Sequence, residues 1–222
     1  MIRFWQKVTA TERKKIAAVI SEITGQPIKY TGVPTHAYEI GGWRVDRLGK
    51  LHSPEIEYEN IEEFEPVLKA LATAGLSVVG DLFVAIGMEE QLDSTLNNLR
   101  SQVTGKANLL SKSLNHPIEQ DSIVASDTDI TVNFFNATLN FDEIKACILL
   151  AEKLIHQAET LKYCFAKEKV VENEKYALRC FLLRLGFIGR MYKTQRKILL
   201  KNLTGNSSFK NGTESDEEVA QC

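Results

Sequence analysis

A run of cations near the C-terminus is the feature of this sequence with the clearest chemistry. The window from Lys175 to Lys210 holds nine Lys and Arg residues and no Asp or Glu. The whole chain carries a formal net charge of -2, so this window of +9 is balanced by -11 in the rest of the chain. Positive charge gathered in one segment attracts polyanions, above all the phosphate backbone of nucleic acids.

Helical geometry arranges these cations further. At 100° per residue, Arg190, Lys193, Lys197 and Lys201 fall within an arc of about 80°. We therefore expect a helix with one packed apolar face and one basic stripe that contacts nucleic acid. The residues predicted to bind it are Arg190, Lys193, Arg196, Lys197 and Lys201. Three alternatives stay open: a solvated helix face, docking on the acidic stretch 55–65 of the same chain, and binding to an acidic partner protein.

Residues that bind metals or catalyse reactions are scattered along the sequence. The four histidines, at 36, 52, 116 and 156, form no HxH or HExxH motif, and no CxxC pair occurs, so we expect no metal and no cofactor. His52 has Asp46 and Glu55 nearby in sequence, which allows a small cluster at the end of a hairpin, although a surface histidine is the simpler interpretation. Nucleotide-binding and nucleophile-elbow motifs are absent. An enzyme of unrecognised type stays open as an alternative, with no catalytic residue to name.

Two further patterns suggest packing rather than chemistry. Cys147, Cys164 and Cys180 lie on apolar faces of sequence with helical spacing, where a thiol is an inert packing group. The sequence from Gly186 to Gly189 has the GxxG spacing of the loop with which KH domains clamp a nucleic-acid backbone. Its two central residues are large and apolar, and no strand follows, so close helix packing or a break between two helices explains these glycines better.

Composition excludes several classes of protein. The chain has 222 residues, of which 44% are hydrophobic and 25% are charged, values that argue against wholesale disorder. No apolar stretch reaches the roughly 18 residues of a membrane-spanning helix. The charged N-terminus lacks the apolar core of a signal peptide. We therefore expect a cytoplasmic protein that does not bind membranes.

The fold class predicted from the pattern of elements is α+β. Residues 1–77 are expected to form a small unit of order β-α-β-β-α, with a short first strand at 2–5. Its clearest signal is the hairpin His36–Asp46, whose Gly41-Gly42 turn places Ile40 opposite Trp43 and Tyr38 opposite Val45.

The second unit, residues 78–167, is expected to repeat that order. It has a strand at 82–86, a helical stretch at 89–114 interrupted near Gly105, short strands at 117–118 and 123–124, a strand at 130–135 and a helix at 142–165. An internal duplication would explain the repeated order, and so would two unrelated units. A long basic helical segment at 168–205 and a disordered tail at 206–222 complete the expected organisation.

Two stretches of the chain resemble a known family. The first runs from Ile28 through the Gly41-Gly42 turn to Asp46, and the second from Glu172 through Gly189 to Ser207. Both are similar to uncharacterised proteins, often labelled virulence-related proteins, that occur in mobile elements and prophages of Gram-positive bacteria. The resemblance implies a bacterial cytoplasmic accessory protein. It brings no reaction, ligand or catalytic residue with it.

Together these observations favour a non-enzymatic accessory protein of a mobile element that binds nucleic acid through its basic C-terminal helix. The leading alternative is a protein–protein interaction module whose surface is the acidic helix or a hairpin edge. The sequence leaves the oligomeric state open.

Overall fold

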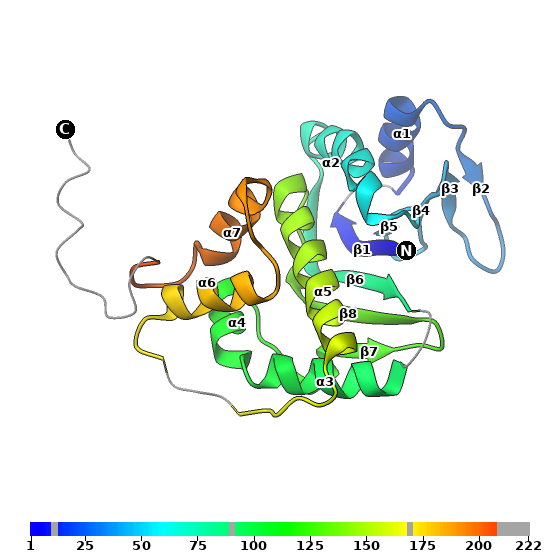
Figure 1. Cartoon of the computed structure of the whole chain (residues 1–222). Helices are drawn as coiled ribbons and strands as arrows, with labels where there is room; N and C mark the ends of the chain where they lie inside the picture. Colours follow the sequence, from blue (N-terminus) through cyan, green and yellow to red (C-terminus); the bar gives the residue numbers. More distant parts are fainter. Residues whose placement is uncertain (10–12, 89–91, 168–170, 208–222) are drawn as a thin grey trace, which may run out of the picture.

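The structure is a computed structural model that describes residues 1–9, 13–88, 92–167 and 171–207. Helices and strands combine in a mixed α+β architecture built on one antiparallel sheet (Figure 1). The strands are β1 (Ile2–Thr9), β2 (Lys29–Tyr30), β3 (Tyr38–Ile40), β4 (Trp43–Val45), β5 (Lys50–His52), β6 (Ser77–Gly87), β7 (Ile123–Ala125) and β8 (Asp129–Asn136). They lie in the order β2-β3-β4-β5-β1-β6-β8-β7.

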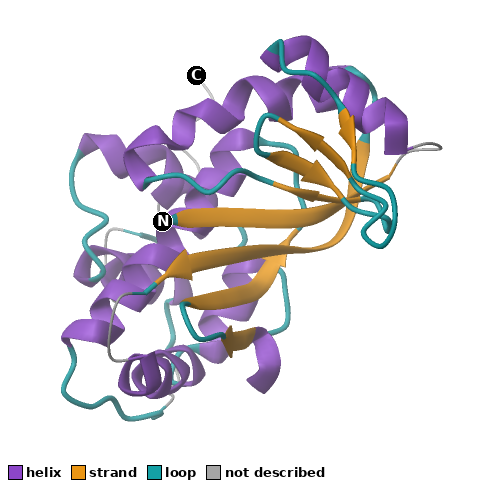
Figure 2. Ribbon diagram, turned by 90° about the vertical axis from the view of Figure 1, so that its right-hand side faces the viewer, coloured by secondary structure: helices purple, strands orange, loops and turns teal. Residues whose placement is uncertain are grey.

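The helices gather on one side of the central strands, as Figure 2 shows. They are α1 (Arg13–Thr24), α2 (Phe64–Thr73), α3 (Leu92–Thr104), α4 (Ala107–Leu114), α5 (Phe141–Thr160), α6 (Glu174–Arg184) and α7 (Lys193–Leu200), with short 3₁₀ turns at 58–63, 120–122 and 190–192. The longest, α5, begins at Asn140, whose side chain accepts a hydrogen bond from the Glu143 backbone N–H. It buries a continuous apolar face against the rest of the core.

The two central strands join the expected first and second units. β1 and β6 pair antiparallel along almost their whole length, from Ile2 opposite Ile86 to Thr9 opposite Ser77. The boundary expected at residue 77 therefore coincides with the start of β6, and both units share one sheet and one hydrophobic core. A duplication stays a prediction.

Alternation along β1 separates the two faces of this sheet. Ile2, Phe4, Gln6 and Val8 are buried, and the residues between them are partly or fully exposed. Gln6 is satisfied inside because its side chain donates to the carbonyl of Thr138 and accepts from that residue's N–H. The opposite face carries Arg3, Trp5, Lys7 and Thr9 outward.

The predicted hairpin is confirmed in its register. Tyr38 lies opposite Val45, and Ile40 lies opposite Trp43. Gly41 has a φ of +51°, and a Cβ at that position would lie 2.6 Å from the Gln26 side chain. Both the backbone angle of the turn and the close contact with Gln26 therefore favour glycine at position 41.

Several boundaries in the second unit differ from expectation. Residues 117–118 form no strand, and the helix expected to reach 165 ends at Thr160. The side chain of Asn98 donates to the carbonyls of Ala158 and Leu161, which satisfies the end of α5 at that point. The interruption predicted near Gly105 is confirmed, because α3 ends at Thr104 and α4 begins at Ala107; residues 89–91 lie outside the described residues.

The C-terminal segment is not one long helix. α6 ends at Arg184, a 3₁₀ turn covers 190–192, and α7 has only eight residues. Gly186 and Gly189 adopt φ values of +90° and +89°, which a right-handed helix does not accommodate. Of the two explanations that the sequence allowed for these glycines, the structure shows the break between two helices. The tail expected to be disordered lies outside the described residues from 208 onward.

Candidate nucleic-acid interface

The structure gives the five predicted cations two different roles. Arg196 is half-buried, and its Nη1 donates to the carbonyl oxygens of Phe187 at 2.7 Å and Gly189 at 2.9 Å. It thereby holds the glycine-containing turn between α6 and α7. Lys201 lies just beyond α7, and its Nζ is 2.6 Å from Oε1 of Glu143. Both residues serve the fold.

The pKa of Glu143 reflects its pairing with Lys201. Burial alone acts to raise the pKa of this carboxyl group, but hydrogen bonds from Lys201 and Thr138 outweigh it and hold the pKa below 4.5. The carboxylate is therefore charged at neutral pH, and it neutralises Lys201.

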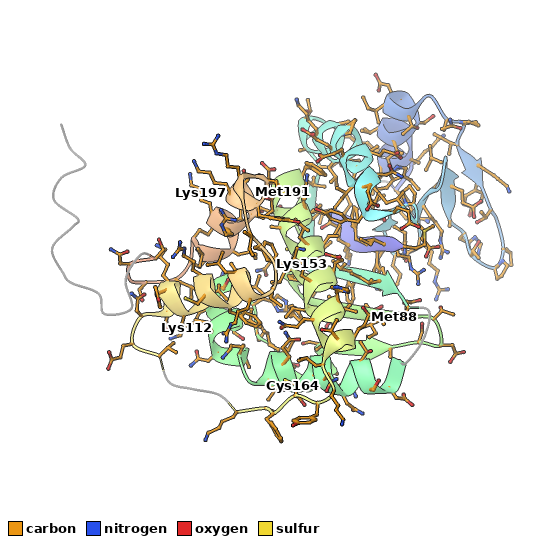
Figure 3. The ribbon with its side chains drawn as sticks, in the orientation of Figure 1. Met88, Lys112, Lys153, Cys164, Met191 and Lys197 are labelled. Atoms are coloured by element: carbon orange, nitrogen blue, oxygen red, sulfur yellow. The ribbon has the colours of Figure 1, made fainter. Side chains whose placement is uncertain are left out.

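The other three predicted cations remain available to a partner. Arg190, Lys193 and Lys197 are exposed, and none forms an ion pair with a carboxylate in the described part of the chain. Lys197 extends from the outer side of α7 toward solvent in Figure 3. We call these three residues the C-terminal basic surface. Ile188 and Met191, which are 64% and 77% exposed, lie beside them in sequence.

The acidic stretch 55–65 lies near α7 but forms no ion pair with the C-terminal basic surface in the described residues. A cavity of about 560 Å³ is lined by Glu62 and Glu65 on one side and by Met191, Thr194 and Gln195 on the other. Glu62 pairs with Lys145 across to α5. The three cations of the C-terminal basic surface do not line this cavity.

A second charged surface lies on the outward face of the central strands. The rings of Trp5 on β1 and Phe83 on β6 are 7° from parallel, with centroids 5.3 Å apart. On the other flank of Trp5, the His52 ring on β5 lies at 6.1 Å and 19°. These residues are direct cross-strand neighbours, so three adjacent strands carry one row of near-parallel rings.

Cations surround this row of rings. Lys50 lies over the Phe83 ring, with Nζ 5.5 Å from its centroid. Lys7 and Arg44 are exposed on the same face. We call this set of rings and cations the open sheet face; its members are Trp5, Lys7, Arg44, Lys50, His52 and Phe83.

The carboxylates near the open sheet face already have partners. Asp129 accepts from Arg3 at 2.7 Å, and Asp81 lies 3.1 Å from His116. Glu39 lies 3.9 Å from Lys29. The cations at the centre of the face are thus not neutralised by these acids.

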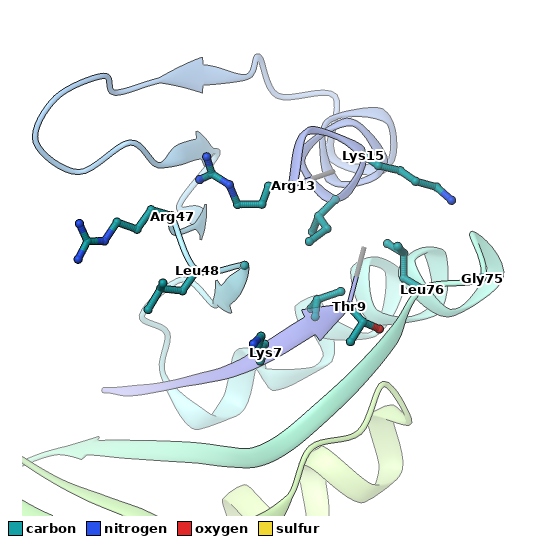
Figure 4. Close-up of a pocket in the computed structure, with 11 residues that line it drawn as sticks. Lys7, Thr9, Arg13, Lys15, Arg47, Leu48, Gly75 and Leu76 are labelled. Carbon is teal, nitrogen blue, oxygen red and sulfur yellow. The ribbon is translucent and has the colours of Figure 1, made fainter. Parts of the chain in front are cut away.

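A basic pocket opens at the end of β1 (Figure 4). It has a volume of about 630 Å³, and its described lining includes Lys7, Arg13, Lys15 and Arg47 but no carboxylate. Arg13 is fixed there, since it donates to the carbonyls of His36 and Asp46 and lies over the Tyr38 ring. Lys15 and Arg47 extend to opposite sides in Figure 4, so the charge is spread around the rim.

His52 and Asp46 meet as the sequence allowed, at 3.4 Å, but Glu55 does not join them, because it pairs with Arg3. Burial lowers the pKa of His52, and the attraction of Asp46 only partly offsets that, so the ring is neutral at neutral pH. For Asp46, burial acts to raise the pKa, but hydrogen bonds from the N–H groups of Lys50 and Leu48 and from His52 outweigh it. The pKa of Asp46 is therefore lowered overall. This pair orders the turn before β5.

A metal-binding cluster is not found in the described residues. No group of three or more His, Cys, Asp or Glu side chains is placed to hold a metal ion in those residues. Burial raises the pKa of the Cys147 thiol, which keeps it protonated. Cys164 lies beyond the end of α5 rather than on a helix. Within the described ranges, no helix combines the length and apolar character needed to cross a membrane.

Comparisons with known proteins add little to this description. No family model matches the chain, and a search of curated proteins gives no match. One solved structure with partial similarity is the complex between prokaryotic ubiquitin-like protein Pup and its ligase PafA, at 10% identity and a TM-score of 0.37. The match covers 71% of this chain and 46% of that one, so the chain spans about half the length of the protein it matches.

Sequence reasoning thus found the C-terminal basic surface and missed the open sheet face. The expected first strand stopped at Trp5, whereas β1 continues to Thr9. Alternation of Arg3, Trp5, Lys7 and Thr9 with buried residues was the signal that could have found the outward face. The partners on β5 and β6 come from elsewhere in the chain, and no local pattern connects them to Trp5.

Proposed function

We propose that this protein is a non-enzymatic accessory protein of a bacterial mobile element that binds nucleic acid through its C-terminal basic surface. The observation that carries the proposal is the exposure of Arg190, Lys193 and Lys197 without a carboxylate partner among the described residues. The accessory role in a mobile element comes from the sequence resemblance alone, and the cytoplasmic location is likewise expected from the sequence only.

The geometry suits phosphates better than bases. Lys193 and Lys197 are four residues apart on α7, so both side chains leave the helix on one side. Flexible lysines act as point charges toward phosphate oxygens and carry little sequence information. Binding through this surface is therefore expected to be insensitive to sequence and to weaken steeply as salt is added.

An acidic partner protein is the second candidate for the same surface. The observation in its favour is the exposure of Ile188 and Met191 beside the cations. Apolar side chains next to positive charge fit a protein interface better than a phosphate backbone does.

Gel-shift titration at low salt tests the proposal with a duplex of mixed sequence. The charge reversals Lys193→Glu and Lys197→Glu are expected to weaken binding about tenfold or more, because each removes a phosphate contact and adds repulsion. Lys14→Glu with Lys162→Glu is the matched control, with the same change of charge at exposed positions elsewhere. Equal binding by the two double variants, or no binding by the wild type, would contradict the proposal.

Co-purification from a bacterial host separates the two candidates. A protein partner that is retained by the wild type, lost with Lys193→Glu and Lys197→Glu, and unaffected by nuclease treatment would favour the acidic-partner function. Loss of captured material on nuclease treatment would favour nucleic acid.

A further inference from the structure

We infer that the open sheet face is a second binding surface, which takes single-stranded nucleic acid by placing unpaired bases on the solvent-facing parts of the rings of His52, Trp5 and Phe83, which already stack on one another at their sides. This inference shares its ligand class with the proposed function but rests on different residues in a different part of the fold. The strands that carry the rings and the helix that carries the C-terminal basic surface lie apart in Figure 1.

The first argument is the position of the rings. Large aromatic side chains are usually buried, since each removes considerable apolar area from water. Here Trp5 and Phe83 occupy outward positions on the two central strands, where both remain partly exposed. Trp43 and Phe4, by contrast, pack edge-on within the core on the inward face.

The second argument is the charge around the rings. Lys50 lies over Phe83, and Lys7 and Arg44 are exposed nearby, whereas Asp129 and Glu39 each pair with a cation and Asp81 contacts His116. Asp46, beside His52, is tied to the backbone N–H groups of Leu48 and Lys50. An apolar protein partner would have to desolvate the three cations without compensation. A chain of phosphates would neutralise them while its bases contact the rings.

The third argument is the basic pocket beside the row. Lys7 belongs to both, because it lies two residues beyond Trp5 on β1 and also lines the pocket with Arg13, Lys15 and Arg47. Cations spread around a rim suit successive phosphates of a passing backbone better than one small enclosed anion. The far end of the face is different, because Arg3 is neutralised there by Asp129 and Glu55. The backbone is thus expected to follow the Lys7 end of the row.

The arrangement distinguishes single strands from duplexes. In a duplex the faces of the bases are stacked on one another and are closed to protein rings, whereas the bases of a single strand can lie on aromatic side chains. Neutral His52 can take part in stacking as a third ring. No base edge needs to be read, so the preference is for strandedness rather than sequence.

Intrinsic fluorescence provides a direct test because the chain has two tryptophans and Trp43 is only 4% exposed. Trp5 is therefore the reporter. The full-length protein is titrated with an oligothymidylate of about 12 nucleotides, and in parallel with a duplex of the same length. Saturable quenching of Trp5 by the single strand, with little quenching by the duplex, is the expected result.

Two variants assign the signal to the face. Phe83→Leu keeps an apolar side chain but removes a ring, and it is expected to weaken the single-strand affinity about 5-fold to 150-fold, the range found when one stacking residue is lost. Phe165→Leu is the matched control, since Phe165 is 78% exposed and pairs with Tyr163 rather than with this face. It should leave the affinity unchanged. Circular dichroism establishes that both variants are folded, and if Phe83→Leu is not, the wild-type titration decides.

The outcomes separate this inference from the proposed function. Quenching that survives in the Lys193→Glu, Lys197→Glu protein supports the open sheet face as an independent surface. Binding in a gel shift without quenching of Trp5, equal quenching by duplex and single strand, or an unchanged affinity in folded Phe83→Leu would overturn the inference. The first of these results would leave the proposed function standing.

Discussion

The C-terminal basic surface and the open sheet face carry the same sign of charge on different supports. The first consists of three flexible cations on a turn and a helix of eight residues. The second is held on the central strands of an eight-stranded sheet, where paired backbones fix the positions of three rings. A short helix with mobile lysines can attract a polyanion, but only a rigid array can position bases.

The two regions also differ in how the protein uses its remaining cations. Near α7, Arg196 and Lys201 are taken up by the fold, and three cations are left for a partner. On the sheet, Arg3 is taken up by Asp129, while Lys7, Arg44 and Lys50 are left. Counting charges in a segment therefore overstates its binding surface, because the fold uses part of that charge internally.

The largest expected effect concerns Arg196. Arg196→Ala removes two hydrogen bonds from a charged donor to the carbonyls of Phe187 and Gly189, and should lower the free energy of unfolding by about 2–3 kcal/mol. Lys197→Ala, at the next residue, should change it by less than about 0.5 kcal/mol. Urea unfolding of both variants checks the division between structural and available cations. Equal stabilities of the two variants would contradict the assignment of Arg196 to the fold and of Lys197 to a partner.

Asp129→Asn sharpens the comparison on the sheet. It removes the charged partner of Arg3 at a site where Asp129 is 7% exposed, and should cost about 1–2 kcal/mol of stability in urea unfolding. The same change leaves Arg3 with Glu55 as its carboxylate partner and removes one negative charge from that end of the row, so single-strand affinity should rise. Asp127→Asn, at an exposed position nearby, is the control, and it should alter neither quantity. A fall in affinity with Asp129→Asn would show that Arg3 does not add to the face.

Glu143→Gln provides the corresponding change beside α7. The Glu143–Lys201 pair is partly exposed, so its loss should cost no more than about 1 kcal/mol at neutral pH. The folded-state pKa of Glu143 is lowered, so its contribution is present above its ordinary pKa of 4.5 and disappears as the pH falls through the lowered value. The stability curves of wild type and variant should therefore converge in acid. Glu63→Gln, an exposed control, should follow the wild type at every pH.

His52 gives the smallest expected effect. Its pKa in the folded state is lowered, so as the pH falls through the ordinary value of 6.5 the unfolded chain takes up a proton more readily than the folded one. Wild-type stability should thus decline slightly from pH 7 toward pH 5. His52→Gln should remove that part of the decline in thermal unfolding measured at each pH. An unchanged profile would show that His52 is not held neutral on the open sheet face.

Local patterns in the sequence were sufficient for some elements and not for others. The hairpin at Gly41-Gly42 was predicted to the residue, because its register depends on a two-residue turn and its immediate flanks. The end of α5 was wrong by five residues, since Asn98 on α3 closes that helix from 60 residues away in sequence. The strand expected at 117–118 is absent because a proline followed by one apolar residue does not determine strand pairing.

The candidate surfaces follow the same division. The cations of the C-terminal basic surface lie within eight residues of one another, so their clustering is visible in the sequence, although the use of Arg196 by the turn is not. The open sheet face joins Trp5, His52 and Phe83, which come together only through the pairing of three strands. Such long-range pairing leaves no local periodicity to detect.

The most direct test of the two-surface account is the fluorescence of Trp5 in the Lys193→Glu, Lys197→Glu protein, titrated with single-stranded oligothymidylate at rising salt. The account predicts that duplex binding in a gel shift is weakened about tenfold or more in this protein. Single-strand quenching of Trp5 should persist within about twofold of the wild-type affinity and decline only gradually with salt, because stacking contributes alongside charge. Loss of quenching together with duplex binding would contradict the account. It would mean that one surface, and not two, binds nucleic acid.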